Sequence, residues 1–139
     1  MALTQGISPP RRGAPPYGGT FGGQVPAGET IWRGGLLCWN AAGQLQRLQT
    51  AGAVSFAGMA NRDYNNSTGA APVSVGMEGL KGTFGLTVPT ATPANINANV
   101  YATDDGTLTL TLPTTGFTGV VGTLAGIENG QTYVKLLGS

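Results

Sequence analysis

The sequence predicts an all-β domain, a small antiparallel barrel or sandwich with an extended N-terminal arm. Three observations indicate this fold. The 24 glycines of the 139-residue chain fall between short apolar runs, where turns and bulges need them. Several of these runs alternate apolar and polar residues, and no segment sustains the 3.6-residue period of a helix. Asn129-Gly130, placed between two such runs, is a strong signal for a two-residue hairpin turn.

The first 27 residues are predicted to form a flexible arm, separate from a β domain over residues 28–139. The arm is rich in proline and glycine. Proline disfavours central strands, and glycine loses much conformational entropy when it becomes ordered. We expect residues 1 to about 25 to be disordered in the isolated protein and to order on a partner. Tyr17 and Phe21 would then be apolar anchors, and Arg11 and Arg12 charge contacts. The alternative is a frayed tail that binds nothing.

The first strands of the domain are expected at residues 31–39, 44–49 and 54–60. Arg33-Gly34-Gly35 interrupts the first run, which indicates a bulged or bent strand, and a turn leads into the second. Residues 61–71 are polar and rich in turn formers, as is typical of a surface loop.

The second half of the domain contains clearer turn signals. Residues 73–78 and 80–88 are strand candidates, and Thr92-Pro93 predicts a short helical turn over residues 93–97. Hairpins are expected between residues 100–103 and 107–112 and between residues 120–128 and 131–137. In the first of these hairpins the leucines should face inward and the threonines outward.

Charge and residue content exclude several functions. The chain has no histidine, only 9% charged residues and a net charge of +1 at pH 7. Without histidine, Ser-His and Cys-His nucleophile pairs cannot form within the chain. The near-neutral balance gives no field that would attract nucleic acid or a membrane surface. Because interface cores are depleted in charge, we expect a subunit of an assembly and not an enzyme.

Two groups of carboxylates are candidates for chemical sites. Asp104-Asp105 is the obvious pair for acid–base catalysis, but both residues precede Gly106 at a hairpin tip, where a turn uses them. A calcium site could draw on Asp63, Asp104, Asp105 or Glu128, yet no loop has the convergent spacing that calcium needs. We therefore expect no catalytic residue, no metal and no cofactor.

Other conspicuous residues have ordinary structural explanations. Cys38 lies between Leu37 and Trp39 and is expected to be a buried thiol. Trp32 and Trp39 are interpreted as core residues in preference to a ligand platform. The overlapping glycosylation sequons at residues 65–68 are interpreted as part of a loop.

No targeting or membrane-spanning segment is expected. Prolines and arginines interrupt the N-terminal region, which lacks the layout of a signal peptide. The longest uncharged stretches, residues 82–103 and 106–127, contain proline, asparagine and many threonines, so neither is apolar enough to cross a bilayer. We expect a soluble product made in the cytoplasm.

Several short stretches carry a resemblance to a known family. They are Val25-Pro-Ala-Gly-Glu-Thr-Ile, Gly43, Phe56-Ala-Gly-Met-Ala-Asn, Tyr64-Asn-Asn-Ser, Val73-Ser-Val, the run over residues 93–111, Val121-Gly-Thr-Leu-Ala-Gly-Ile-Glu-Asn-Gly and a closing Val-Lys-Leu. From Val25 to the C-terminus, about four-fifths of the chain, the sequence resembles the capsid decoration, or cement, proteins of tailed bacteriophages.

The resemblance implies a head-stabilising structural protein of the virion. Such proteins are made in the host cytoplasm, bind the outer surface of the expanded capsid and bridge neighbouring major-capsid subunits without contact to DNA. Many are trimers and some are dimers. The resemblance therefore predicts the major capsid protein as partner and a homo-oligomer, a homotrimer in preference to a dimer.

Two alternative functions stay open on the sequence. One is another β-module of the virion, at a fibre base or on the tail, although knob-like repeats and a long trimerising shaft are missing from the sequence. The other is a β-barrel that binds a carbohydrate or a small ligand. An open pocket lined by aromatic side chains would indicate this last function.

Overall fold

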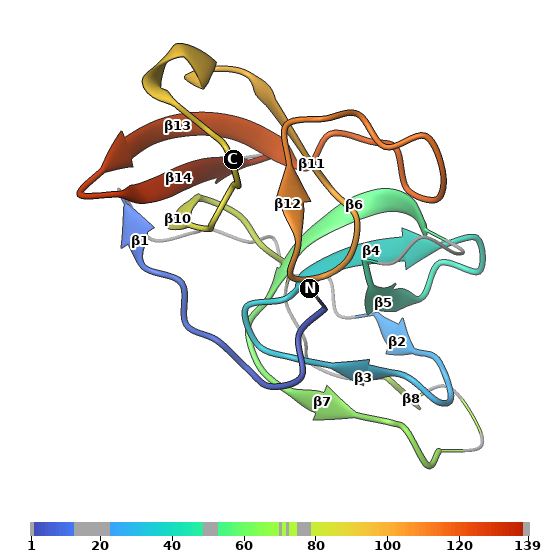
Figure 1. The fold of residues 1–139 in the computed structure, drawn as a ribbon. Coiled ribbons are helices and arrows are strands. Elements are labelled where there is room, and N and C mark those ends of the chain that lie inside the picture. The colour runs from blue at the N-terminus through green and yellow to red at the C-terminus, as the bar shows by residue number, and fades with distance from the viewer. Residues whose placement is uncertain are drawn as a thin grey trace.

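The computed structural model describes residues 2–12, 23–48, 53–69, 71, 73–74 and 79–137, and these residues form an all-β structure (Figure 1). The strands are β1 (Arg11–Arg12), β2 (Gln24–Val25), β3 (Thr30–Ile31), β4 (Leu36–Asn40), β5 (Leu45–Arg47), β6 (Ala53–Ala60), β7 (Tyr64–Asn65), β8 (Val73–Ser74), β9 (Gly79–Leu80), β10 (Thr83–Gly85), β11 (Asn99–Ala102), β12 (Leu108–Thr109), β13 (Gly122–Glu128) and β14 (Gln131–Leu136). A short 3₁₀ helix, η1, covers Pro93–Asn95. The predicted fold class is confirmed.

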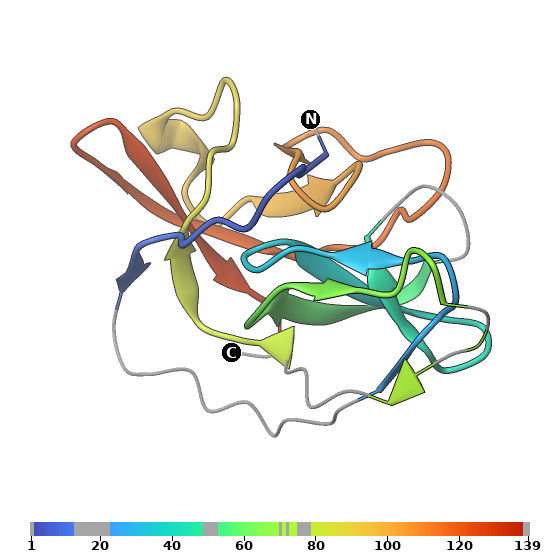
Figure 2. The same ribbon diagram turned by 90° about the horizontal axis from the view of Figure 1, so that it is seen from below.

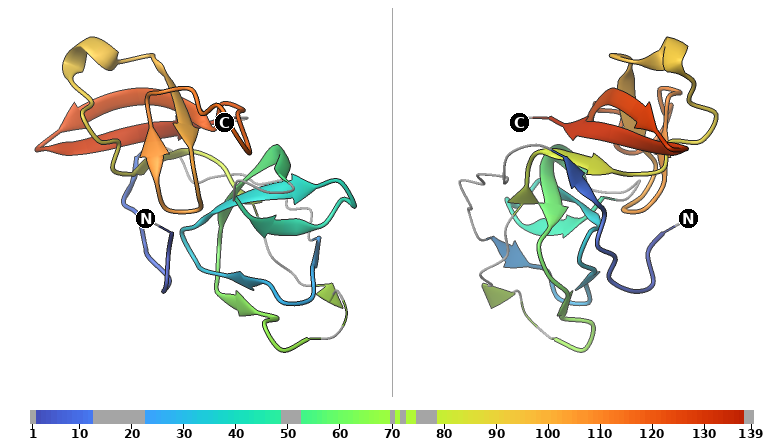
Figure 3. Two further views of the ribbon diagram at one scale, coloured as in Figure 1. Left: turned by 45° about the vertical axis from the view of Figure 1, so that its right-hand side comes forward. Right: turned by 90° about the vertical axis from the view of Figure 1, so that its left-hand side faces the viewer.

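Two antiparallel sheets make up most of the domain. One has six strands in the order β1-β10-β14-β13-β11-β12, and the other has four in the order β5-β4-β6-β9. Two further ladders, β2 with β8 and β3 with β7, contain two strands each. Figure 1 shows the β13–β14 hairpin above the four-stranded sheet and the two short ladders below it. The same layering is visible from two other directions in Figure 3.

The larger hydrophobic core lies between the two main sheets. Strands of both sheets contribute to it, and residues of one strand that do so alternate along the chain, because successive side chains of a strand point to opposite faces. Its buried members are Leu36, Leu48, Met59, Phe84, Leu86, Val88, Val100, Ala102, Leu108, Phe117, Val121, Leu124, Val134 and Leu136. This core makes the domain a small sandwich.

A second, smaller core covers the opposite face of the four-stranded sheet. Its buried members are Val25, Ile31, Leu37, Leu45, Ala57 and Ala60, with Trp39 and Tyr64 packed against them. Strand β4 therefore has buried residues on both faces, which explains why residues 36–39 are apolar without interruption. Cys38, on the same strand, is buried as expected.

A bulge in β6 allows this strand also to serve both cores. Leu37 pairs with Gly58 and Cys38 with Phe56, so Ala57 is an extra residue on the β6 side. Gly58 takes up the irregularity with a φ of +114°, a conformation open to glycine. As a result Ala57 faces the smaller core and Met59 faces the larger one.

Two turns that the local sequence predicts are confirmed by the structure. Asn129 and Gly130 have φ values of +51° and +78° and join β13 to β14, as the dipeptide predicts. Thr92 precedes the 3₁₀ turn, and its N–H donates to Asn95 Oδ1 at 2.8 Å. In this part of the chain the predicted elements differ from the observed ones mainly at their ends.

Some sequence expectations need correction. The expected loop at residues 61–71 contains a strand, β7, which pairs with β3 because the main chain of residues 64–65 lies beside Thr30 and Ile31. The expected inward orientation of every leucine in residues 107–112 is wrong for Leu112, which is 56% exposed. The β11–β12 ladder ends at Thr109, so the strand pairing that makes side chains alternate between the two faces does not reach Leu112.

The N-terminal expectation also changes. Residues 2–12 lie against the domain, and Gln24–Val25 forms β2, with Val25 fully buried in the smaller core. Paired structure therefore extends into residues assigned to a disordered arm. The physical reason is that β8 and β10 offer partners for main-chain hydrogen bonds that the local sequence does not reveal.

Replacing Asn66 by alanine is expected to lower the free energy of unfolding by about 1–3 kcal/mol. Its buried Nδ2 donates to the carbonyl oxygens of Val25 (3.2 Å), Pro26 (3.0 Å) and Ala71 (3.2 Å), and alanine leaves all three without this donor. Urea denaturation measures the loss. The exposed Thr68→Ala, in the same loop, is the control and should change stability by less than about 0.5 kcal/mol. Equal effects of the two variants would contradict this role for Asn66.

Candidate functional site: the N-terminal strap and its groove

Two of the predicted contact residues, Arg11 and Arg12, lie at the end of an extended segment, residues 2–12, here called the strap. The strap crosses one side of the domain and ends in β1, on the outer edge of the six-stranded sheet (Figure 2). Arg11 pairs with Phe84 and Arg12 with Thr83. Two of the four predicted contacts, Arg11 and Arg12, are thus placed on a sheet edge by their backbone. The other two, Tyr17 and Phe21, lie outside the described residues.

Hydrogen bonds fasten the strap at three separate points. The Leu3 N–H donates to Asp105 Oδ1 at 3.0 Å, and the Ile7 N–H donates to the Arg33 carbonyl at 2.7 Å. The Gly85 N–H donates to the Pro10 carbonyl at 2.6 Å. Each bond involves the strap's main chain, so the attachment depends on an extended backbone more than on particular side chains.

Glycines form the surface on which the strap lies. A Cβ at Gly34 would lie 2.5 Å from Ile7 Cγ1, and one at Gly85 would lie 2.5 Å from Pro10 Cγ. A Cβ at Gly35 would lie 3.1 Å from Leu3 Cδ1. The lack of side chains at these three positions produces a groove into which the strap fits closely.

A cavity of about 210 Å³ lies beneath the strap. Residues 7–9 line it on the strap side, and Gly34, Leu36, Leu86 and Asp105 line it on the domain side. The Asp105 main chain is fixed there because its carbonyl accepts the Leu36 N–H at 3.0 Å. This bond joins the β11–β12 turn to the start of β4, across the two main sheets.

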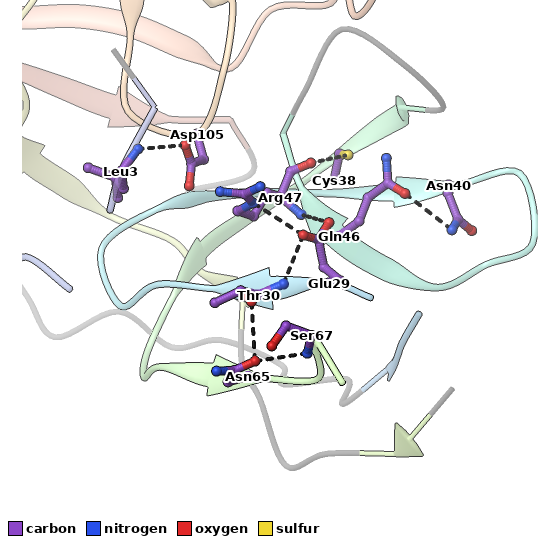
Figure 4. Close-up of polar contacts among 10 residues, drawn as sticks. All are labelled: Leu3, Glu29, Thr30, Cys38, Asn40, Gln46, Arg47, Asn65, Ser67 and Asp105. Atoms are coloured by element: carbon purple, nitrogen blue, oxygen red, sulfur yellow. Dashed lines mark hydrogen bonds and ion pairs between the residues drawn. The ribbon is translucent and has the colours of Figure 1, made fainter. Parts of the chain in front are cut away.

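Asp105 is an unusual residue within this surface. Only 2% of it is exposed, and Oδ2 has no hydrogen-bond partner among the described residues, while Oδ1 accepts the Leu3 N–H (Figure 4). Burial raises the pKa of the Asp105 carboxyl group above its ordinary value, and the charge of Asp104 adds to the rise. The hydrogen bond from Leu3 and the charge of Arg47 oppose it.

The two adjacent aspartates therefore have different surroundings. Asp104 Oδ1 accepts the Gly106 N–H at 2.9 Å, and its Oδ2 accepts the Thr107 hydroxyl at 3.1 Å. These bonds hold the hairpin turn, as the interpretation of Asp104 as a turn residue predicts. Asp105 instead faces the domain interior, a placement that the sequence did not indicate. Its contact with Leu3 joins residues 102 positions apart, and no local signal could have revealed it.

An ion pair near the smaller core ties β3 to β5. Arg47 Nε lies 3.2 Å from Glu29 Oε1, and the Arg47 N–H donates to Glu29 Oε2 at 3.2 Å (Figure 4). The same carboxylate accepts the Thr30 N–H at 3.0 Å. The Glu29 carboxylate thus receives three donors, one from the start of β3 and two from β5.

The candidate calcium ligands Asp63, Asp104, Asp105 and Glu128 do not form a cluster in the described part of the chain. No three His, Cys, Asp or Glu side chains are grouped there as a metal would need. Asp63 lies apart from the Asp104–Asp105 turn and accepts the Arg33 N–H at 2.7 Å. Among the same residues, no helix has both the length and the apolar character to cross a bilayer.

Aromatic side chains do not line the cavity beneath the strap. A second cavity of about 260 Å³ lies beside the β13–β14 hairpin, where Tyr133 is the aromatic member of its lining and Glu128 the charged one. Trp39 packs against the smaller core, in agreement with its predicted structural role, and Trp32 is partly buried. Neither cavity has the stacked aromatic platform expected for carbohydrate binding.

Comparison of this chain with models of known families, with curated proteins and with solved structures gives no match.

Proposed function

We propose that this protein is a structural component of a tailed-phage virion that binds the outer surface of the mature capsid and bridges neighbouring major-capsid subunits. The observation that carries the proposal is the position of Arg11 and Arg12. They form β1, the terminal strand of the six-stranded sheet, and one backbone edge of β1 faces away from β10. An edge strand can pair with an extended segment of another protein through main-chain hydrogen bonds.

This geometry supports a contact in which an extended segment of the major capsid protein continues the sheet beyond β1. The two arginines would add charge-assisted hydrogen bonds to capsid carboxylates. The proposed partner is protein only, and the chain's net charge of +1 is consistent with a surface that does not attract DNA. The resemblance of residues 25–139 to capsid decoration proteins supports the same function.

We further propose a homotrimer on the particle. Closed symmetry hides neutral surface and covers strand edges without leaving an open end. Large apolar side chains are available for subunit contacts, namely Val54, Ile96, Leu112 and Leu137. The preference for three subunits over two comes from the resemblance. A particle reconstruction would distinguish the two, because the density of the protein would have either threefold or twofold symmetry.

Capsids that carry the protein are expected to release DNA at a higher temperature than capsids stripped of it. Binding to the assembled shell alone stabilises it, by about 2.7 kcal/mol per site at a hundredfold excess of protein over Kd. The measurement is dye-detected DNA release on heating, with re-addition of the protein to stripped particles. Identical release temperatures, together with binding of the isolated protein to a soluble glycan, would instead favour the ligand-binding alternative.

The same particles test the two arginines. The double variant Arg11→Gln/Arg12→Gln should bind stripped capsids about tenfold to a hundredfold more weakly for each charge-assisted hydrogen bond that the substitution removes. Arg62→Gln is the control, because it removes an exposed positive charge between β6 and β7, outside the six-stranded sheet. If the double variant binds as well as Arg62→Gln, the proposed role of β1 is wrong.

A further inference from the structure

The strap has the character of a segment that can detach. Most of its side chains in residues 2–10 are exposed or partly exposed, and its main chain is fixed at only a few separate points. Segments with little buried apolar surface open at low free-energy cost, well below global unfolding. The groove beneath is formed by Gly34, Gly35 and Gly85 of the domain.

Asp105 is the one ionisable group of the β11–β12 turn that the strap covers directly. With the strap in place, Oδ1 accepts the Leu3 N–H, while Oδ2 is shielded from water and lacks a donor among the described residues. A neutral carboxyl group tolerates such a site far better than a carboxylate, because an ion without solvation or a partner is costly to bury. Detachment of the strap would return water to Asp105 and remove this cost.

Other charged groups around Asp105 do not cancel the effect. The strap itself carries no charged side chain in residues 2–10. Arg47 on β5 favours the carboxylate, and Asp104 on the same turn disfavours it. Arg33, in the loop before β4, directs its Nε to the Ile7 carbonyl at 3.4 Å. The balance leaves the pKa of Asp105 raised in the closed structure.

We propose that residues 2–12 form a releasable strap and that the protonation state of Asp105 controls its release. The strap is held when the carboxyl group is neutral and loosened when it is ionised. Release exposes the glycine groove and the free edge of β10, so the isolated domain has a closed and an open form. This behaviour belongs to the chain itself and does not require the capsid.

The direction of the pH effect follows from linkage. Asp105 has an ordinary pKa when the strap is open and a raised pKa when it is closed, so closing takes up a proton. The closed form is therefore favoured at acidic pH and is lost as pH rises through the raised pKa. For each unit by which closing raises the pKa, the closing equilibrium of the ionised protein is weakened about tenfold relative to the neutral one.

A nitroxide spin label on Thr4→Cys tests the proposal in the full-length chain. Thr4 is exposed, and the native Cys38 thiol is fully buried, so labelling is selective. Electron paramagnetic resonance spectra between about pH 4 and 8 distinguish the immobile label of a closed strap from the mobile label of an open strap. The mobile fraction is expected to rise with pH, with a midpoint above the ordinary range for aspartate.

Three further variants, each carrying the label, complete the design. Asp105→Asn should abolish the pH response, whereas Glu128→Gln, an exposed carboxylate on the β13–β14 hairpin, should leave it unchanged. Gly85→Ala places a Cβ against Pro10 and should give the mobile spectrum at every pH, which calibrates the open form. A pH-independent spectrum of the parent, whether mobile or immobile, overturns the proposal, as does a full pH response in Asp105→Asn.

Discussion

Replacing Gly58 by alanine is expected to lower the free energy of unfolding by about 3 kcal/mol or more. Two costs combine. At a φ of +114°, alanine is strained by about 1–3 kcal/mol. Its Cβ would also lie 2.7 Å from the Gly79 carbonyl carbon and 2.8 Å from the Leu80 oxygen, and such overpacking costs about 1–3 kcal/mol. The atoms in the way are backbone, so they cannot turn aside as a flexible side chain could.

The measurement is urea denaturation followed by tryptophan fluorescence. Gly126→Ala is the control, because this glycine lies on β13, has no positive φ, and an added Cβ would meet nothing within 4 Å. It should change stability by less than about 1 kcal/mol. A Gly58→Ala midpoint equal to that of Gly126→Ala would show that the β6 bulge is not required in this form.

Leu124→Ala is expected to cost about 2–5 kcal/mol of stability. Leu124 lies on β13 with no exposed surface and packs in the larger core between the two main sheets. Its main chain is fixed, because the Leu124 N–H donates to the Ala98 carbonyl at 3.0 Å, its carbonyl accepts the Asn97 N–H at 2.8 Å, and Val134 on β14 pairs with it on the other side. The backbone cannot move to fill the space that a smaller side chain leaves, so a cavity remains.

Leu137→Ala provides the matched comparison, with the same change of side chain just beyond the end of β14. Leu137 is 51% exposed and should cost less than about 1 kcal/mol. Single domains commonly have about 5–15 kcal/mol of stability, so Leu124→Ala removes a large share of it. If the two leucine variants unfolded at the same urea concentration, the position assigned to the larger core would be wrong.

Short-range signals predicted much of the fold. The Asn129-Gly130 turn, the Thr92-Pro93 start of the 3₁₀ turn and the residues of β6 were all identified from local patterns, since each depends on backbone preferences within a few residues. Apolar alternation is a weaker guide where a strand ends, as the exposure of Leu112 shows. The strand β7 was missed because its paired residues in β3 lie 33 and 35 positions away in the sequence and no apolar pattern marks it.

The sequence predicted the contact residues of the candidate site but not the attachment of the strap. The sequence predicts Arg11 and Arg12 as contact residues, and their backbone lies on a sheet edge. The attachment of the strap was not foreseen, because Leu3, Ile7 and Pro10 each meet residues far away in the chain. The expectation of a disordered arm followed from its composition, which gives the cost of ordering the segment but not the surface available to receive it.

By itself, the sequence determined the all-β class, the hairpin turns and the low charge of this protein, because these are set by composition and by conformational preferences of neighbouring residues. Only the tertiary structure decided that β4 has buried residues on both faces, that a bulge at Gly58 serves two cores, and that Asp105 lies beneath the strap. Those features arise where segments distant in sequence pack together. Their free energy comes from burial and from hydrogen bonds between partners that neither segment specifies alone.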